Sequence, residues 1–113
     1  LVGAFGGSFV EADDIAQHQY DLIVNATPIG MSPDFNTMPV PEECIREGMA
    51  VFDLVYSPLE TKLLRHAKEK GATAISGLTM FLEQGLEQER IWLDRTLQGQ
   101  DYEDLLRSHL AAP

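Results

Sequence analysis

Three short apolar runs, separated by stretches of helical character, constrain the fold of this chain most strongly. They lie at Asp21–Ala26, Ala50–Val55 and Ala72–Ile75. Each run is too short for a typical helix and is bounded by polar or turn-forming residues, so each predicts a β-strand. The continuous apolar character of the first two is typical of strands buried on both faces, as in a parallel sheet. A weaker run at Ser8–Val10 predicts a further short strand.

Sequence patterns typical of helices occur between these runs and after the last one. Ser57-Pro58-Leu59-Glu60 predicts a helix start, with a serine cap, a proline suited to the first helical position and a glutamate that completes a capping box. Gly71 is expected to end that helix. A long helix is predicted from Thr79 to about Leu97, and residues 99–113 predict a terminal helix.

The alternation of strands and helices predicts a parallel sheet with right-handed crossovers. We expect an α/β fold, namely a partial Rossmann-like parallel sheet with flanking helices. It would lack the first βαβ unit, where the pyrophosphate of a dinucleotide binds. Gly3, Gly6 and Gly7 do not supply that unit, because their spacing is G-x-x-G-G and not G-x-G-x-x-G. We interpret them as the cap and turn after a helical turn at Leu1–Phe5.

The net charge, the single cysteine and the histidines limit the kinds of partner and metal site that we expect. With 18 acidic and 8 basic residues, the net charge is −10, so we expect neither nucleic acid nor an anionic membrane as a partner. Cys44 is the single cysteine, which excludes an internal disulfide and favours a cytoplasmic location. The histidines fall in separate predicted helices, so no metal site is expected. Because Leu1 stands in place of an initiator Met, we expect a fragment or a processed chain.

Three motifs stand at the ends of the predicted strands. Asn25–Met31 reads N-A-T-P-I-G-M, Asp53–Thr61 reads D-L-V-Y-S-P-L-E-T, and Gly77–Gly85 reads G-L-T-M-F-L-E-Q-G. In this order and at this spacing they resemble the shikimate and quinate dehydrogenase family, over about residues 8–93. Two places depart from the family pattern: Glu89 stands where an aromatic residue is usual, and Leu93-Asp94 stands where Thr-Gly often follows the tryptophan.

The resemblance implies a fold, a reaction and a cofactor. Residues 1–113 would be the carboxyl-terminal part of a Rossmann-type NADP-binding domain. The family reversibly reduces 3-dehydroshikimate to shikimate with NADPH, a step of aromatic amino-acid biosynthesis. The implied cofactor-binding residues, near the nicotinamide half, are Asn25, Thr27, Leu54, Gly77 and Met80, with Leu54 and Gly77 acting through their backbones. The implied substrate-binding residues are Tyr56 and Gln84, through hydrogen bonds to hydroxyl or carboxylate groups.

Each of these residues also has an ordinary structural interpretation. Asn25 to Thr27 is a plain exit from a strand, Gly77 a turn, Tyr56 a half-buried packing residue and Gln84 a solvated helix residue. The family's catalytic lysine and aspartate have no counterpart in the matched residues, so no catalytic residue is assigned. We therefore expect the chain alone to be inactive and not to bind NADP(H) at micromolar concentration.

Two other interpretations stay open on the sequence. One is a non-catalytic α/β interaction or regulatory module, and the other is the tail of a fused dehydroquinate dehydratase–shikimate dehydrogenase. The sequence does not choose shikimate over quinate, or NADP over NAD. The open edge of a partial sheet favours pairing with a second copy, so a homodimer is an expected assembly.

Overall fold

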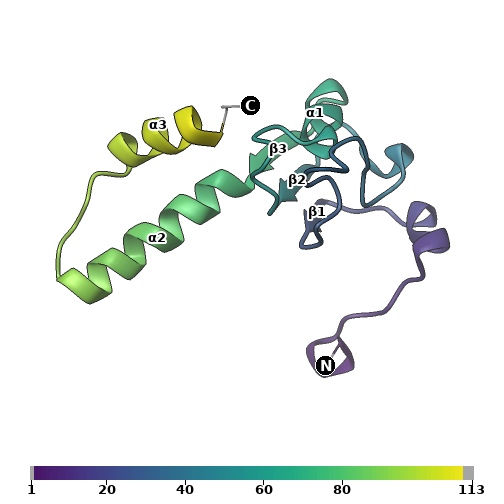
Figure 1. Ribbon diagram of the computed structural model, residues 1–113. Helices are drawn as coiled ribbons and strands as arrows, with labels where there is room; N and C mark the ends of the chain where they lie inside the picture. The colour runs from purple at the N-terminus through teal and green to yellow at the C-terminus, as the bar shows by residue number, and fades with distance from the viewer. Residues whose placement is uncertain (1, 111–113) are drawn as a thin grey trace.

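A computed structural model describes residues 2–110 of the chain, and within them it shows a three-stranded parallel sheet. The strands are β1 (Leu22–Asn25), β2 (Ala50–Asp53) and β3 (Thr73–Ser76), and they lie in the order β1-β2-β3 (Figure 1). Both neighbouring pairs are parallel. The predicted α/β class and the three predicted strands are confirmed. The predicted helical turn at Leu1–Phe5 includes Leu1, and the predicted terminal helix includes residues 111–113; these residues lie outside the part of the chain that the structure describes.

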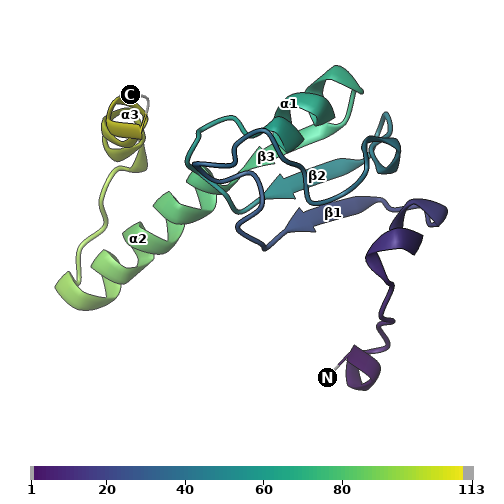
Figure 2. The same cartoon turned by 45° about the vertical axis from the view of Figure 1, so that its right-hand side comes forward.

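Helices precede, connect and follow the strands. The short 3-10 helices are η1 (Val2–Phe5), η2 (Ala12–Gln17) and η3 (Glu42–Cys44), and the α-helices are α1 (Lys62–Glu69), α2 (Gly77–Leu93) and α3 (Gly99–Leu110). Helix α1 connects β2 to β3, whereas α2 starts directly at the end of β3 and runs away from the sheet (Figure 2). Helix α3 turns back beside α2 (Figure 1). None of the helices within residues 2–110 combines the length and the apolar character needed to cross a membrane.

The start of α1 differs from the sequence prediction. The helix begins at Lys62, and its cap is Thr61, whose side chain accepts a hydrogen bond from the Leu64 amide. Ser57 and Pro58, the predicted cap and first helical residue, lie in the preceding loop. The reason is that Thr61 also donates to the buried carboxylate of Asp53, which fixes the cap at this position. The capping box that the sequence suggested is therefore wrong.

The bounds of α2 also differ. The helix begins at Gly77, two residues before the predicted start, because the side chain of Ser76 accepts from the Leu78 amide and caps it. It ends at Leu93 and not near Leu97, since Asp94 adopts a left-handed conformation with φ 48°. The carboxylate at Glu89 is exposed, so the departure from the family pattern buries no charge.

The segment before β1 forms no strand at Ser8–Val10, contrary to the prediction. Phe9 in this segment is 76% exposed, and the segment joins η1 to η2 without pairing to the sheet. A strand needs a hydrogen-bonded neighbour, which residues 2–110 do not offer there.

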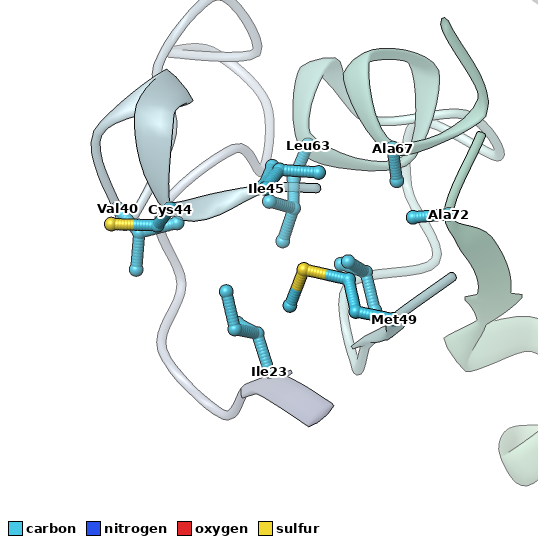
Figure 3. Packing of buried hydrophobic residues seen from close by; sticks show 9 residues of the cluster. Ile23, Val40, Cys44, Ile45, Met49, Leu63, Ala67 and Ala72 are labelled. Carbon is cyan, nitrogen blue, oxygen red and sulfur yellow. The ribbon is translucent and has the colours of Figure 1, made fainter. Parts of the chain in front are cut away.

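The hydrophobic core lies on one face of the sheet, between the strands, α1 and the η3 segment (Figure 3). It comprises Ile23, Val40, Cys44, Ile45, Met49, Val51, Leu63, Ala67 and Ala72. The prediction of burial on both faces is wrong for β1, and the second face of β2 is only half-buried. Leu22 and Val24 alternate with the buried residues of β1 and are 51% and 48% exposed. Side chains on successive strand residues point to opposite faces, so covering one face leaves the other open.

Candidate functional site

The three motifs meet at one edge of the sheet. Asn25, Asp53 and Ser76 are the last residues of their strands and stand level with one another in the register. The loops after β1 and β2 and the start of α2 therefore gather at the carboxyl ends of the strands (Figure 2). In open α/β sheets this edge is where ligands bind.

A buried network of polar side chains joins the ends of β1 and β2. Asn25, Asp53 and Thr61 are 2%, 0% and 0% exposed. The amide nitrogen of Asn25 donates to Asp53 Oδ1 over 2.9 Å, and the backbone amide of Val55 donates to the same oxygen over 3.0 Å. The hydroxyl of Thr61 donates to Asp53 Oδ2 over 2.6 Å. Both carboxylate oxygens of Asp53 are thus satisfied without a cation.

The same network shapes the loop after β1. Both the backbone amide and the hydroxyl of Thr27 donate to Asn25 Oδ1, over 3.1 and 2.6 Å. The amide nitrogen of Asn25 also donates to the carbonyl of Ile29 over 3.0 Å. The side chain of Asn25 is therefore fully engaged within the chain, and it positions the loop. A direct contact of Asn25 or Thr27 with a cofactor stays a prediction.

Gly77 and Leu54, whose backbones the resemblance implied would contact the nicotinamide end, lie in direct contact with each other. A β-carbon at position 77 would lie 2.5 Å from the carbonyl oxygen of Leu54 and 2.7 Å from that of Asp53. Any side chain there would collide with backbone, so only glycine allows α2 to start against the end of β2. This close approach gives Gly77 a structural role that the sequence interpretation, an open approach for a ligand, did not include.

The two predicted substrate residues both lie near Phe81, since each lines a hollow that Phe81 also lines. The ring of Tyr56 stacks on that of Phe81, with 4.7 Å between centroids and 29° between planes. Gln84 is exposed one turn further along α2. Met80, which precedes Gln84 by four residues, shares its side of the helix and is 38% exposed. The predicted residues of this motif thus extend outward from the sheet edge along α2.

Helix α3 also contributes to this region, which the sequence interpretation did not anticipate. Gln84 and Tyr56 line two neighbouring hollows between α2 and α3, and both hollows share Phe81, Leu105 and Leu106. The apolar residues of α3 were visible in the sequence, but nothing there paired them with α2. Asp53 and Thr61 were also missed as site residues, although a lone aspartate inside an apolar strand run is an unusual signal.

Among the titratable groups outside this edge, Cys44 and Glu60 have shifted pKa values. Burial, and then the neighbouring carboxylate of Glu43, raises the pKa of the Cys44 thiol. The hydrogen bond from Lys68 lowers the pKa of Glu60. Within residues 2–110, no three His, Cys, Asp or Glu side chains gather in a way that could hold a metal ion.

Comparison with known proteins shows that the chain is similar to shikimate dehydrogenases. No protein-family model matches it. The NADP(+)-dependent shikimate dehydrogenase of Maridesulfovibrio salexigens is 42% identical over 111 residues, which is 97% of this chain and 41% of that protein. Shikimate 5-dehydrogenase from Thermus thermophilus, solved with NADP(H) and shikimate, superimposes with a TM-score of 0.80 at 34% identity, over 95% of this chain and 40% of that one.

A second solved structure broadens the comparison. Quinate dehydrogenase from Corynebacterium glutamicum, in complex with NAD, gives a TM-score of 0.82 at 28% identity, over 94% of this chain and 39% of that one. The chain therefore spans about two fifths of the length of these relatives. In sequence, and in the fold of the described residues, the chain is similar to a segment of these shikimate dehydrogenases.

Proposed function

We propose that the chain forms the wall of an active site that faces the nicotinamide and the substrate in an NADP-dependent shikimate dehydrogenase. The whole enzyme would reversibly reduce 3-dehydroshikimate to shikimate. The observation that supports this most directly is the meeting of all three motifs at the carboxyl edge of the sheet. The relatives described above supply the reaction and the cofactor.

The residues at this edge fit the nicotinamide end of the cofactor. The backbones of Leu54 and Gly77 lie together there, and Met80, Ile29 and Met31 offer half-exposed apolar surface for a flat ring. The sequence has no G-x-G-x-x-G loop for the pyrophosphate, so the fit is limited to that end. NADPH supplies the hydride when bound, and in our proposal this chain orients the ring and excludes water from one side.

Substrate recognition in this proposal falls to Tyr56 and Gln84. The phenol and the side-chain amide can each donate and accept hydrogen bonds, which suits the hydroxyl and carboxylate groups of shikimate. Stacking on Phe81 limits the directions in which the Tyr56 hydroxyl can point. No residue of the three motifs is assigned to proton transfer in this proposal.

An exchange of segments tests the proposal. The 113-residue chain would replace the matching segment of the Maridesulfovibrio salexigens enzyme, which is 42% identical. We expect NADP-dependent oxidation of shikimate, and a higher KM for shikimate in the Gln84→Ala variant. The matched control is Gln88→Ala, one turn further along α2. If the exchange enzyme folds but neither Gln84→Ala nor Tyr56→Phe changes its KM for shikimate, the assignment of these two residues to substrate binding is wrong.

The chain alone provides a second measurement. Titration with NADPH, followed by nucleotide fluorescence, should show no binding at micromolar concentration, because the phosphate-binding loop is absent from this sequence. Tight binding would instead favour an independent nucleotide-binding module. The likeness to quinate dehydrogenase with NAD makes quinate and NAD the alternatives to assay in parallel.

A further inference from the structure

We propose that Asp53 is a positioning residue that locks the loop after β1 to the loop after β2, so that the cofactor-facing and substrate-facing segments move as one unit. The inference rests on the proposed function for its catalytic consequence. The locking itself is a property of this chain and can be measured without any ligand.

The evidence is the set of groups that Asp53 ties together. Its carboxylate accepts from Asn25 at the end of β1, from the Val55 amide in its own loop, and from Thr61 at the start of α1. A fully buried carboxylate is costly unless its oxygens are hydrogen-bonded, so these three bonds favour one arrangement of three segments.

The network continues beyond Asp53 in both directions. Asn25 Oδ1 accepts from Thr27, and Thr61 Oγ1 accepts from the Leu64 amide over 3.2 Å. A continuous series of hydrogen bonds therefore runs from the loop after β1 to the first turn of α1. Such networks respond as a unit when one member is removed.

The positions that this network fixes are those of the proposed site. Val55, whose amide Asp53 holds, lies between Leu54 and Tyr56. Leu54 contributes the backbone against Gly77, and Tyr56 stacks on Phe81. Two backbone hydrogen bonds also join these segments. The Leu54 amide donates to the Asn25 carbonyl over 3.0 Å at the strand ends, and the Ser32 amide donates to the Ser57 carbonyl over 3.4 Å, which is long and gives little restraint further out in the loops.

The test removes one link and leaves the strands intact. Thr61→Val deletes the hydroxyl with little change of shape, and Thr61→Ser restores it. In the full chain, amide hydrogen exchange would be measured by NMR at Leu64, Val55 and Thr27. We expect Thr61→Val to speed exchange about three- to tenfold at all three amides, and Thr61→Ser to restore it. Exchange at Val51, in the centre of β2, serves as the control for global unfolding.

Two outcomes decide the inference. If only Leu64 responds, Thr61 is a helix cap and the locking is wrong. In the segment-exchanged enzyme, Thr61→Val should raise KM for NADPH and for shikimate together with kcat retained, whereas a purely structural role would lower the active fraction and leave both KM values unchanged. An exchange enzyme that is inactive with the unaltered chain would count against the proposed function, while the amide exchange would still decide the locking.

Asp53→Asn gives an independent check on the carboxylate. The substitution keeps one oxygen for Asn25 and Val55 but places an amide nitrogen toward Thr61, whose hydroxyl then loses its acceptor. Exchange at Leu64 should rise more than exchange at Val55. Equal rates in Asp53→Asn and the unaltered chain at every one of these amides would overturn the role given to Asp53.

Discussion

Gly77 packs so closely on Leu54 that a β-carbon at position 77 would lie 2.5 Å from the Leu54 carbonyl oxygen. Backbone atoms cannot yield as the end of a flexible side chain can. We therefore expect Gly77→Ala to lower the free energy of unfolding by about 1–3 kcal/mol, as overpacking does elsewhere. Urea unfolding followed by circular dichroism measures this change.

Gly85 is the matched control for that substitution. It lies in the same helix, and a β-carbon there would meet nothing within 4 Å. Because alanine is favoured over glycine within helices, Gly85→Ala should leave the stability unchanged or raise it by up to about 1 kcal/mol. Similar losses in both variants would mean that the contact with Leu54 is not the cause.

The stacking of Tyr56 on Phe81 should appear as a coupling energy. In a double-mutant cycle with Tyr56→Leu and Phe81→Leu, we expect about 0.5–1.5 kcal/mol of interaction beyond the two single effects. The free energies come from urea unfolding. Phe9, which is 76% exposed, provides the control, since Phe9→Leu should change the stability by less than about 0.5 kcal/mol. A coupling energy near zero would show that stacking on Phe81 does not hold Tyr56 in place.

Because of Cys44, we expect the folded chain to lose stability in alkaline solution. Burial, and then Glu43, raises the pKa of its thiol in the folded chain above the unfolded value. The unfolded chain therefore loses the proton first, and the stability that is complete below about pH 8.5 falls as the pH rises through the folded pKa. Urea midpoints between pH 7 and pH 10 should fall more steeply for the unaltered chain than for Cys44→Ala. Parallel slopes would show that the thiol does not contribute.

Because of Glu60, we expect a smaller loss of stability in acidic solution. Its pKa is lowered by the hydrogen bond from Lys68, so the stabilisation is present above the unfolded pKa of about 4.3 and is lost as the pH falls through the folded value. Both side chains are about half-exposed, so we expect only roughly 0.2–0.5 kcal/mol at pH 7. Glu60→Gln and Lys68→Met should each remove it at pH 7, without adding when combined, and the effect of each should shrink as the pH falls through the folded pKa of Glu60.

Strand positions followed from the sequence because they depend on local composition. The runs at Asp21–Ala26 and Ala50–Val55 contain β1 and β2, and the observed strands differ from the predicted runs by at most two residues at either end. The start of α1 could not be predicted in the same way. Ser57-Pro58 is a strong local signal, but Thr61 is the residue that reaches the carboxylate of Asp53. That contact exists only after the chain has folded.

The residues of the site also divide into those that the sequence identified and those that only the structure shows. The resemblance implied backbone contacts of Gly77 and Leu54 with the nicotinamide, which stay a prediction, whereas the close approach of these two residues to each other was found only in the structure. The contribution of α3 was not predicted, because the residues that meet Phe81, such as Leu105, stand more than twenty positions away and have no distinctive motif. Contacts at such separation depend on how the helices turn and not on local sequence pattern.

The sequence by itself determined the α/β class, the three strands and the motifs that stand at their ends, since these depend on apolar runs and on residues adjacent in the chain. Only the tertiary structure decided that Asn25, Asp53 and Thr61 share one buried network, that one face of β1 stays open, and that α2 must start with a glycine. The physical reason is that burial and hydrogen-bond partners are set by segments distant in sequence, and a buried carboxylate is stable only where all of them meet.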